Sequence, residues 1–111
     1  MPELPKCLLI VTAEIDSSVE AEWNRWYDEV HLPEALACPG VLYGARYLAA
    51  RDASLTDHGA PALDGARVYA TVYALAAPEA MDTPEFQQMR GWYQFANRIK
   101  ARTQVFLSLD S

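Results

Sequence analysis

The sequence predicts an α+β domain with the ferredoxin-like order of elements, β-α-β-β-α-β, in which both helices cover one face of a four-stranded antiparallel sheet. Three observations support this fold class. The chain has 111 residues, which suits a single domain, residues 1–111, with one core. Its hydrophobic fraction of 51% is typical of a globular protein. Its apolar segments switch between strand-like and helix-like periodicity in the stated order.

The first strand and the first helix are predicted near the start of the chain. Lys6–Ala13 is aliphatic and β-branched on both faces, so we expect a strand that is buried on both sides. Ser17, followed three residues later by Glu20, fits a capping box that starts a helix running to about His31. Pro33 lacks the amide proton that a helix interior needs, so we expect the helix to kink or restart there.

Three further strands and a second helix follow. Val41–Ala50 is predicted as the second strand and Arg67–Leu75 as the third. The polar segment Arg51–Gly65 between them is long for a hairpin connection, which indicates a mobile or functional loop. Thr83–Ala96 opens with Thr-Pro-Glu, a strong helix start, and keeps helical spacing. Thr103–Leu109 is predicted as the last strand.

The third strand has two faces of different character. The small apolar face, which we expect under the helices, consists of Val68, Ala70, Val72 and Ala74. The larger face consists of Tyr69, Thr71 and Tyr73, joined by Phe106 from the last strand. This larger face is too apolar to lie in water and needs a second sheet against it. We therefore predict a homodimer that packs sheet against sheet.

Charge and cysteine content exclude several classes of protein. The net charge is −6 and no basic run exceeds two neighbours, which argues against a nucleic-acid partner and against docking on anionic membranes. The apolar run Cys7–Val11 is too short for a signal peptide or a spanning helix, so we expect a cytoplasmic protein with no membrane partner. Cys7 and Cys38 are predicted to be small buried thiols.

The stretch Glu22–Tyr47 carries a recognisable pattern. It reads W-x-x-W-Y-D-x-x-H-L-P-E, then C-P-G, then A-R-Y. With the order of elements, this pattern resembles the EthD-like branch of the dimeric α+β barrel superfamily. The matching positions are Trp26, Tyr27, His31, Pro33, Gly40, Arg46 and Tyr47.

The resemblance implies a dimeric barrel with a pocket in each protomer, between the sheet and the first helix, and it implies that His31 lines this pocket. Such relatives include cofactor-free oxygenases, cyclases and dehydratases of secondary metabolism or aromatic catabolism. The Asn-Trp-His set of the antibiotic-biosynthesis monooxygenases and their haem-degrading relatives has no counterpart here, so the resemblance implies neither haem nor another cofactor.

His31 is the candidate general acid or base. An unperturbed imidazole titrates near neutrality, at about pH 6.5, and Asp28 could orient the ring from the preceding turn. The alternative is a histidine that forms a hydrogen bond at the kink before Pro33 and only shapes the end of the helix.

Aromatic and basic side chains could complete the site. Tyr69 is a further catalytic candidate, because its hydroxyl could polarise a substrate oxygen. Arg46 could hold a carboxylate or an enolate, or equally form a salt bridge to an acid on the first helix. The candidate substrate-binding residues are Trp26, Tyr27, Arg46, Tyr73 and Phe106. The alternative for each aromatic residue is a place in the core or in an interface.

These residues predict a small cofactor-free enzyme that acts by acid/base chemistry as a cyclase, dehydratase or isomerase. Its substrate would be a hydrophobic aromatic or polyketide-like small molecule. The alternatives are a non-catalytic small-molecule-binding or accessory dimer and a cofactor-independent monooxygenase. No metal site is predicted, because His31 and His58 lack the spacing and the partners that metal ligands need.

Overall fold

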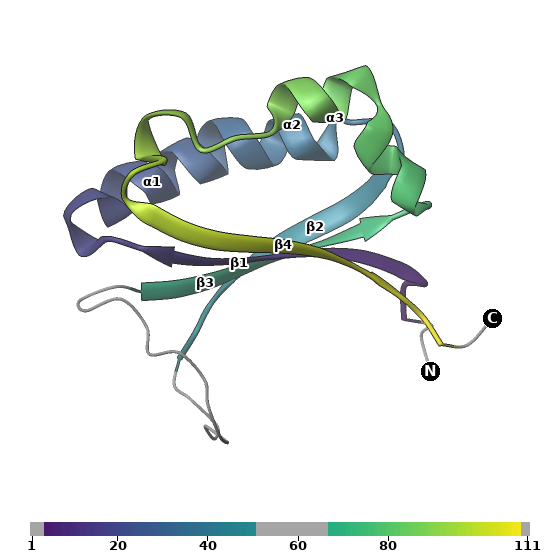
Figure 1. The fold of residues 1–111 in the computed structure, drawn as a ribbon, viewed down its shortest axis with the longest axis horizontal. Coiled ribbons are helices and arrows are strands. Elements are labelled where there is room, and N and C mark those ends of the chain that lie inside the picture. Colours follow the sequence, from purple (N-terminus) through teal and green to yellow (C-terminus); the bar gives the residue numbers. More distant parts are fainter. Residues whose placement is uncertain (1–3, 51–66, 110–111) are drawn as a thin grey trace.

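The computed structural model describes residues 4–50 and 67–109, in which one layer of helices covers one face of an antiparallel sheet (Figure 1). The four strands lie in the order β2-β3-β1-β4, and each neighbouring pair is antiparallel. They are β1 (Cys7–Ile15), β2 (Val41–Leu48), β3 (Arg67–Leu75) and β4 (Ile99–Leu107). This is the ferredoxin-like α+β fold that the sequence predicts. The predicted loop 51–65 lies outside the described residues.

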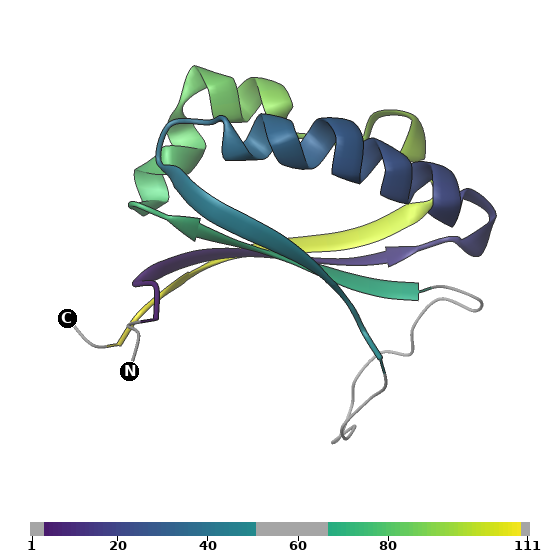
Figure 2. The same ribbon diagram turned by 180° about the vertical axis from the view of Figure 1, so that it is seen from behind.

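The first helical segment runs along the sheet without restarting at Pro33 (Figure 2). It consists of α1 (Glu20–Trp26), a π-helical turn at Tyr27–His31, and α2 (Leu32–Leu36). The Leu32 amide donates to the Tyr27 carbonyl, five residues back, while Leu32 keeps helical angles of φ −63° and ψ −47°. A proline ring clashes with the carbonyl four residues before it in a regular helix, and the wider π turn relieves that clash. The predicted break is therefore replaced by a π turn.

The start of this segment differs from the predicted capping box. The cap is Asp16, whose Oδ1 accepts a hydrogen bond from the Ser18 amide at 2.9 Å. A single 3-10 turn, Ser17–Val19, then precedes α1. The shorter turn brings the Ser18 amide to the aspartate, and Ser17 lies inside the turn rather than at its cap.

The second helical segment starts as predicted but ends early. Thr83 Oγ1 accepts a hydrogen bond from the Phe86 amide at 3.1 Å, and α3 (Pro84–Met89) follows. The chain then takes a positive φ of 120° at Gly91, which is incompatible with a helix. The helical spacing to Ala96 therefore does not correspond to one continuous helix, and only a 3-10 turn, Tyr93–Phe95, follows Gly91.

The two faces of β3 are exchanged relative to the prediction. Tyr69 and Tyr73 pair with Ala13 and Leu9 of β1, face the helices, and are 8% and 3% exposed. These rings fill the wide gap between the sheet and the tryptophans of the first helix, where small side chains would leave cavities. The small residues instead face away from the helices.

The outer face of the sheet, opposite the helices, consequently has a large apolar part, beside polar residues such as Glu14 and Gln104. Cross-strand pairs share a face, and those pairs place Phe106 beside Leu8 on this side. We define the outer face by its apolar members Leu8, Ile10, Tyr43, Ala45, Tyr47, Val68, Ala70, Val72 and Phe106. Tyr43, Tyr47 and Phe106 are 57%, 59% and 44% exposed, so much of this surface lies open in the single chain. The first strand was predicted to be buried on both sides. In the structure only its inward residues are fully buried, and its outward residues are covered only in part.

Candidate ligand-binding site

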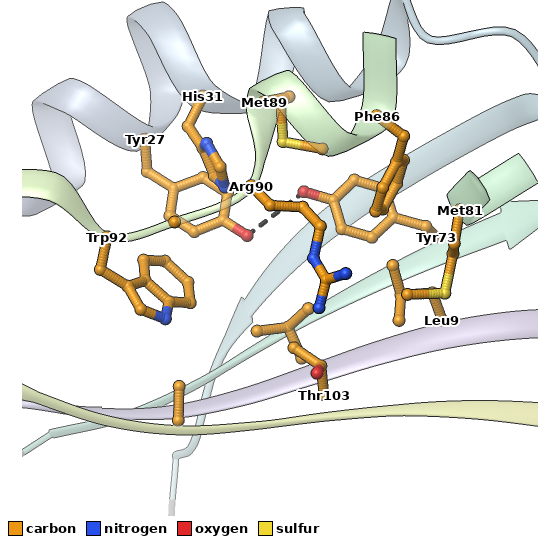
Figure 3. A pocket seen from close by; sticks show the side chains of 13 residues that line it. Leu9, Tyr27, His31, Tyr73, Met81, Phe86, Met89, Arg90, Trp92 and Thr103 are labelled. Atoms are coloured by element: carbon orange, nitrogen blue, oxygen red, sulfur yellow. Dashed lines mark hydrogen bonds between the residues drawn. The ribbon is translucent and has the colours of Figure 1, made fainter. Parts of the chain in front are cut away.

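A cavity of about 360 Å³ lies between the sheet and the helical layer (Figure 3). Its size falls within the range of small-molecule pockets, about 300–1,000 Å³. The first helical segment contributes Tyr27 and His31, and β3 contributes Tyr73. The rest of the wall consists of Leu9, Val11, Met81, Phe86, Met89, Arg90, Gly91, Trp92, Ala101 and Thr103. The cavity is therefore mainly apolar, with a few polar groups that converge on it.

The π-helical turn determines where His31 lies. In a π turn, residues five apart come nearly above one another, which brings His31 over Trp26. The two rings are stacked, with centroids 4.5 Å apart and planes 18° apart. The Tyr27 ring meets the imidazole edge-on at 4.8 Å. His31 is only 7% exposed as a result.

His31 is neutral at neutral pH in this environment. Burial disfavours the imidazolium and the Arg46 guanidinium repels it, so the pKa of His31 is lowered from 6.5 to about 4. Its Nδ1 is buried and has no hydrogen-bond partner. A neutral imidazole has one acceptor nitrogen and one N–H donor. The ring lines the cavity, where a neutral imidazole can accept a proton or a hydrogen bond but does not act as an acid.

Asp28 contacts Arg46 in the structure rather than His31, which it was expected to orient. Its carboxylate accepts a hydrogen bond from Arg46 Nη1 at 2.7 Å, and its side chain is 63% exposed. The π turn directs Asp28 outward, while it directs His31 toward the sheet. The alternative in which His31 is held by a hydrogen bond at a helix kink is also not what the structure shows, because Nδ1 is unpaired.

Tyr27 and Tyr73 form a pair of hydroxyls inside the cavity. Their oxygens are 3.2 Å apart, and either can donate to the other (Figure 3). Burial raises the pKa of both phenols, so both stay protonated. One of the two hydroxyls donates its proton to the other oxygen. The hydroxyl that accepts this bond keeps its own proton, which it can donate to another group. Gly44 on β2 makes room for this arrangement, because a Cβ there would lie 2.6 Å from the Tyr73 ring.

Arg46 supports the site from behind rather than lining it. Its guanidinium lies over the Tyr27 ring at 4.2 Å and also contacts Trp23 at 5.0 Å. Besides Asp28, it donates to Asn24 Oδ1 at 2.8 Å. Of the two roles predicted for Arg46, the structure shows the salt bridge to the first helix.

The remaining predicted site residues lie outside the cavity wall. Tyr69 donates to Glu20 Oε2 at 2.5 Å and accepts from Asn24 Nδ2 at 2.8 Å, in a second core cluster. Trp26 lies behind His31, and Phe106 lies on the outer face. The structure thus brings together Tyr27, His31 and Tyr73, and separates Tyr69 and Phe106 from them.

Sequence reasoning missed the side of the cavity formed after α3. Arg90, Gly91 and Trp92 lie there in a segment with no regular periodicity, so no pattern indicated which way they face. The positive φ at Gly91 redirects the chain between Arg90 and Trp92. The glycine within an otherwise helical pattern was the available signal, since it marks a break in the helix.

Two negative findings apply to residues 4–50 and 67–109. No group of three or more His, Cys, Asp and Glu side chains there could hold a metal ion. No helix in that part of the chain is long and apolar enough to cross a membrane. Cys7 and Cys38 are buried and free, as predicted.

Comparison with known proteins identifies the fold. No family model matches the sequence, and no curated protein matches it significantly. The structure is similar to HapK from Hahella chejuensis, with a TM-score of 0.61 and 18% identity over 95% of this chain and 94% of that chain. The structure is also similar to a putative antibiotic biosynthesis monooxygenase from Nitrosomonas europaea, with a TM-score of 0.56 and 10% identity over 99% of this chain and 97% of that chain.

SnoaB, a cofactor-independent oxygenase from Streptomyces nogalater, gives a TM-score of 0.53 and 13% identity over 96% of each chain. These identities are low, so the likeness establishes a shared ferredoxin-like α+β fold and nothing finer. The class that these likenesses define is therefore that of the ferredoxin-like α+β proteins.

Proposed function

We propose that the protein is a cofactor-free enzyme that takes a proton from an aromatic or polyketide-like molecule bound in the cavity. The observation that carries this proposal is that a neutral His31 lines the same cavity as the Tyr27–Tyr73 pair. A base and a hydroxyl donor in one cavity suit substrates that have an acidic C–H or O–H bond next to a carbonyl group.

The two groups have complementary roles in this reaction. His31 accepts the proton that leaves the substrate. The tyrosine hydroxyl whose proton is not used within the Tyr27–Tyr73 pair donates a hydrogen bond to the enolate or phenolate oxygen that develops. With a pKa of about 4, His31 is a weak base before the substrate reacts. The anion that forms beside it stabilises the imidazolium and raises the pKa of His31, so the histidine becomes a stronger base as the proton is transferred. Cyclisation, dehydration and isomerisation all begin in this way.

Hydrogen exchange provides the test without knowledge of the natural substrate. β-Tetralone carries acidic protons beside a ketone, and their exchange for deuterium in D₂O is followed by NMR. We expect the protein to accelerate this exchange, and His31→Gln to abolish the acceleration while Tyr27→Phe reduces it. Acceleration that is unchanged in His31→Gln would contradict the proposal.

The second candidate is a cofactor-independent oxygenase. Its support is the shared fold with SnoaB, which carries that description, and the fact that the same proton removal yields an electron-rich anion. Oxygen consumption with a dihydroxynaphthalene distinguishes the two functions, because the acid/base enzyme consumes none. A binder without activity would take up the ketone and leave its protons unexchanged.

We further propose that the protein is a homodimer that buries the outer face, and that it belongs to the EthD-like branch. The support for the dimer is the extent of exposed aromatic and aliphatic surface on that face, including Tyr43, Tyr47 and Phe106. The support for the branch is the pattern from Trp23 to Tyr47, whose Tyr27 and His31 line the cavity.

A further inference from the structure

We propose that the cavity selects ligands that carry a carboxylate, and that Arg90 binds this group. The inference rests on the proposed function, because it concerns the ligand of the same cavity. It adds a substrate class and a binding residue that the sequence pattern did not indicate.

Arg90 is the charged member of the cavity wall. It follows α3 directly, and its side chain extends from there along the cavity toward the sheet (Figure 3). The wall contains no aspartate or glutamate, and His31 is neutral. Arg90 is an exposed residue, and its guanidinium lies beside neutral, largely apolar wall residues. The cavity therefore carries a net positive charge that attracts an anion.

The Arg90 guanidinium has no structural task within the described residues. Arg46 and Arg98 form ion pairs with Asp28 and Asp16, at 2.7 and 3.6 Å, whereas no ion pair or side-chain hydrogen bond joins Arg90 to another residue there. The backbone amide of Arg90 does close the last turn of α3 by donating to Phe86, and a substitution of the side chain leaves that bond intact. The side chain is therefore available to a ligand.

The positions of the polar groups define the shape of the ligand. Thr103 on β4 supplies a hydroxyl on the sheet side of the cavity, toward which Arg90 extends. A carboxylate between them can accept hydrogen bonds from both, and guanidinium binds carboxylate with two parallel bonds. The Trp92 ring provides a surface on which an aromatic ring of the ligand can pack. The Tyr27–Tyr73 pair can form a hydrogen bond with a neutral oxygen at another position of the same ligand. The expected ligand is a flat molecule with an acid at one position and a carbonyl or hydroxyl at another.

Two probes of matched shape test the charge preference. Naphthoate and naphthamide differ in charge but hardly in size, and calorimetry measures the affinity of each. In the unmodified protein we expect naphthoate to bind about tenfold or more tightly than naphthamide, which is the usual scale of one charge-assisted hydrogen-bonded pair. Arg90→Gln should bring the two affinities close together, and Arg90→Lys should keep part of the preference.

The control for net charge is Arg25→Gln, at an exposed position on α1 outside the cavity wall. This variant should leave the preference for naphthoate unchanged. Equal affinity of the two probes in the unmodified protein, or a preference that persists in Arg90→Gln, would overturn the inference. Accelerated exchange of β-tetralone that depends on His31 would in either case leave the proposed function standing. Failure of both probes to bind would contradict the inference and the small-molecule site together.

Discussion

The imidazole of His31 lies flat against the indole of Trp26, with their centroids 4.5 Å apart. The two residues are five positions apart, a separation that a regular α-helix places on different sides and a π turn brings together. The turn at Tyr27–His31 precedes Pro33, whose ring disfavours a regular helix at this point. We infer that the proline, which looked like a helix breaker, is the reason that His31 is stacked, buried and turned toward the sheet.

Trp26→Ala removes the stacked indole and should admit water to His31. Because burial is the main cause that lowers the pKa of His31 to about 4, we expect the pKa to rise toward the ordinary value of about 6.5. NMR titration of the imidazole protons measures this shift, and a His58→Gln background leaves one histidine signal. A pKa that stays near 4 in Trp26→Ala would show that the stacking is irrelevant to the charge of His31.

Neutral His31 makes the stability of the fold depend on pH. Its folded-state pKa of about 4 lies below the value of about 6.5 in an unfolded chain, so the unfolded state binds the proton first as the pH falls. The contribution is complete above about pH 6.5 and is lost as the pH falls toward 4. Between about pH 7.5 and 4.5, the free energy of unfolding should fall by roughly 2 to 3 kcal/mol more in the unmodified protein than in His31→Gln. Urea unfolding at the two pH values provides the measurement, and equal losses would rule out a depressed pKa.

Gly44→Ala should disturb the Tyr27–Tyr73 pair without touching either tyrosine. The new Cβ would lie 2.6 Å from the Tyr73 ring, so the ring must move and the hydroxyl contact of 3.2 Å must change. Overpacking of this kind costs about 1–3 kcal/mol, which thermal unfolding detects. The variant should also slow the exchange of β-tetralone. Ala37→Ser, at an exposed position after α2 that lies outside the cavity wall and the outer face, is the control and should do neither.

A charge on the outer face should separate the proposed dimer. Val72 lies in the middle strands of that face, opposite Ile10 and Ala45. Val72→Asp places a carboxylate where the second sheet would pack, and the cost of burying an unpaired charge favours monomers. Light scattering after size exclusion measures the mass, and circular dichroism shows whether the fold remains. Ala21→Asp, on the exposed side of α1, should leave the mass unchanged. An unmodified protein that is already a monomer would contradict the dimer directly.

Periodicity predicted the fold well but assigned the faces of β3 incorrectly. The alternation of Arg67–Leu75 indicated a strand with two distinct faces, yet alternation alone does not tell which face meets the helices. The deciding factor is the volume available under Trp23 and Tyr27, and this depends on how far the helix stands from the sheet. That distance is a tertiary property, so Tyr69 and Tyr73 were placed on the wrong side.

The candidate site was predicted in part for similar reasons. His31 and Tyr27 were found because they lie in one continuous helical segment, where spacing along the chain fixes their relative positions. Asp28 was misassigned because the π turn changes those positions. Pro33 signals an irregular helix, but it does not tell whether the chain breaks, kinks or forms a π turn. Arg90 was not found because it lies beside Gly91, in a segment whose path depends on a positive φ rather than on regular structure.

The pH dependence of β-tetralone exchange tests the central claim, that neutral His31 is the base, most directly. The profile of the rate at low substrate concentration reports the pKa of the base in the free protein. We expect a rate that rises through about pH 4, is level near neutrality, and is lost in His31→Gln. A profile that rises only near pH 6.5, the value of an exposed imidazole, or one that His31→Gln leaves intact, would contradict the account.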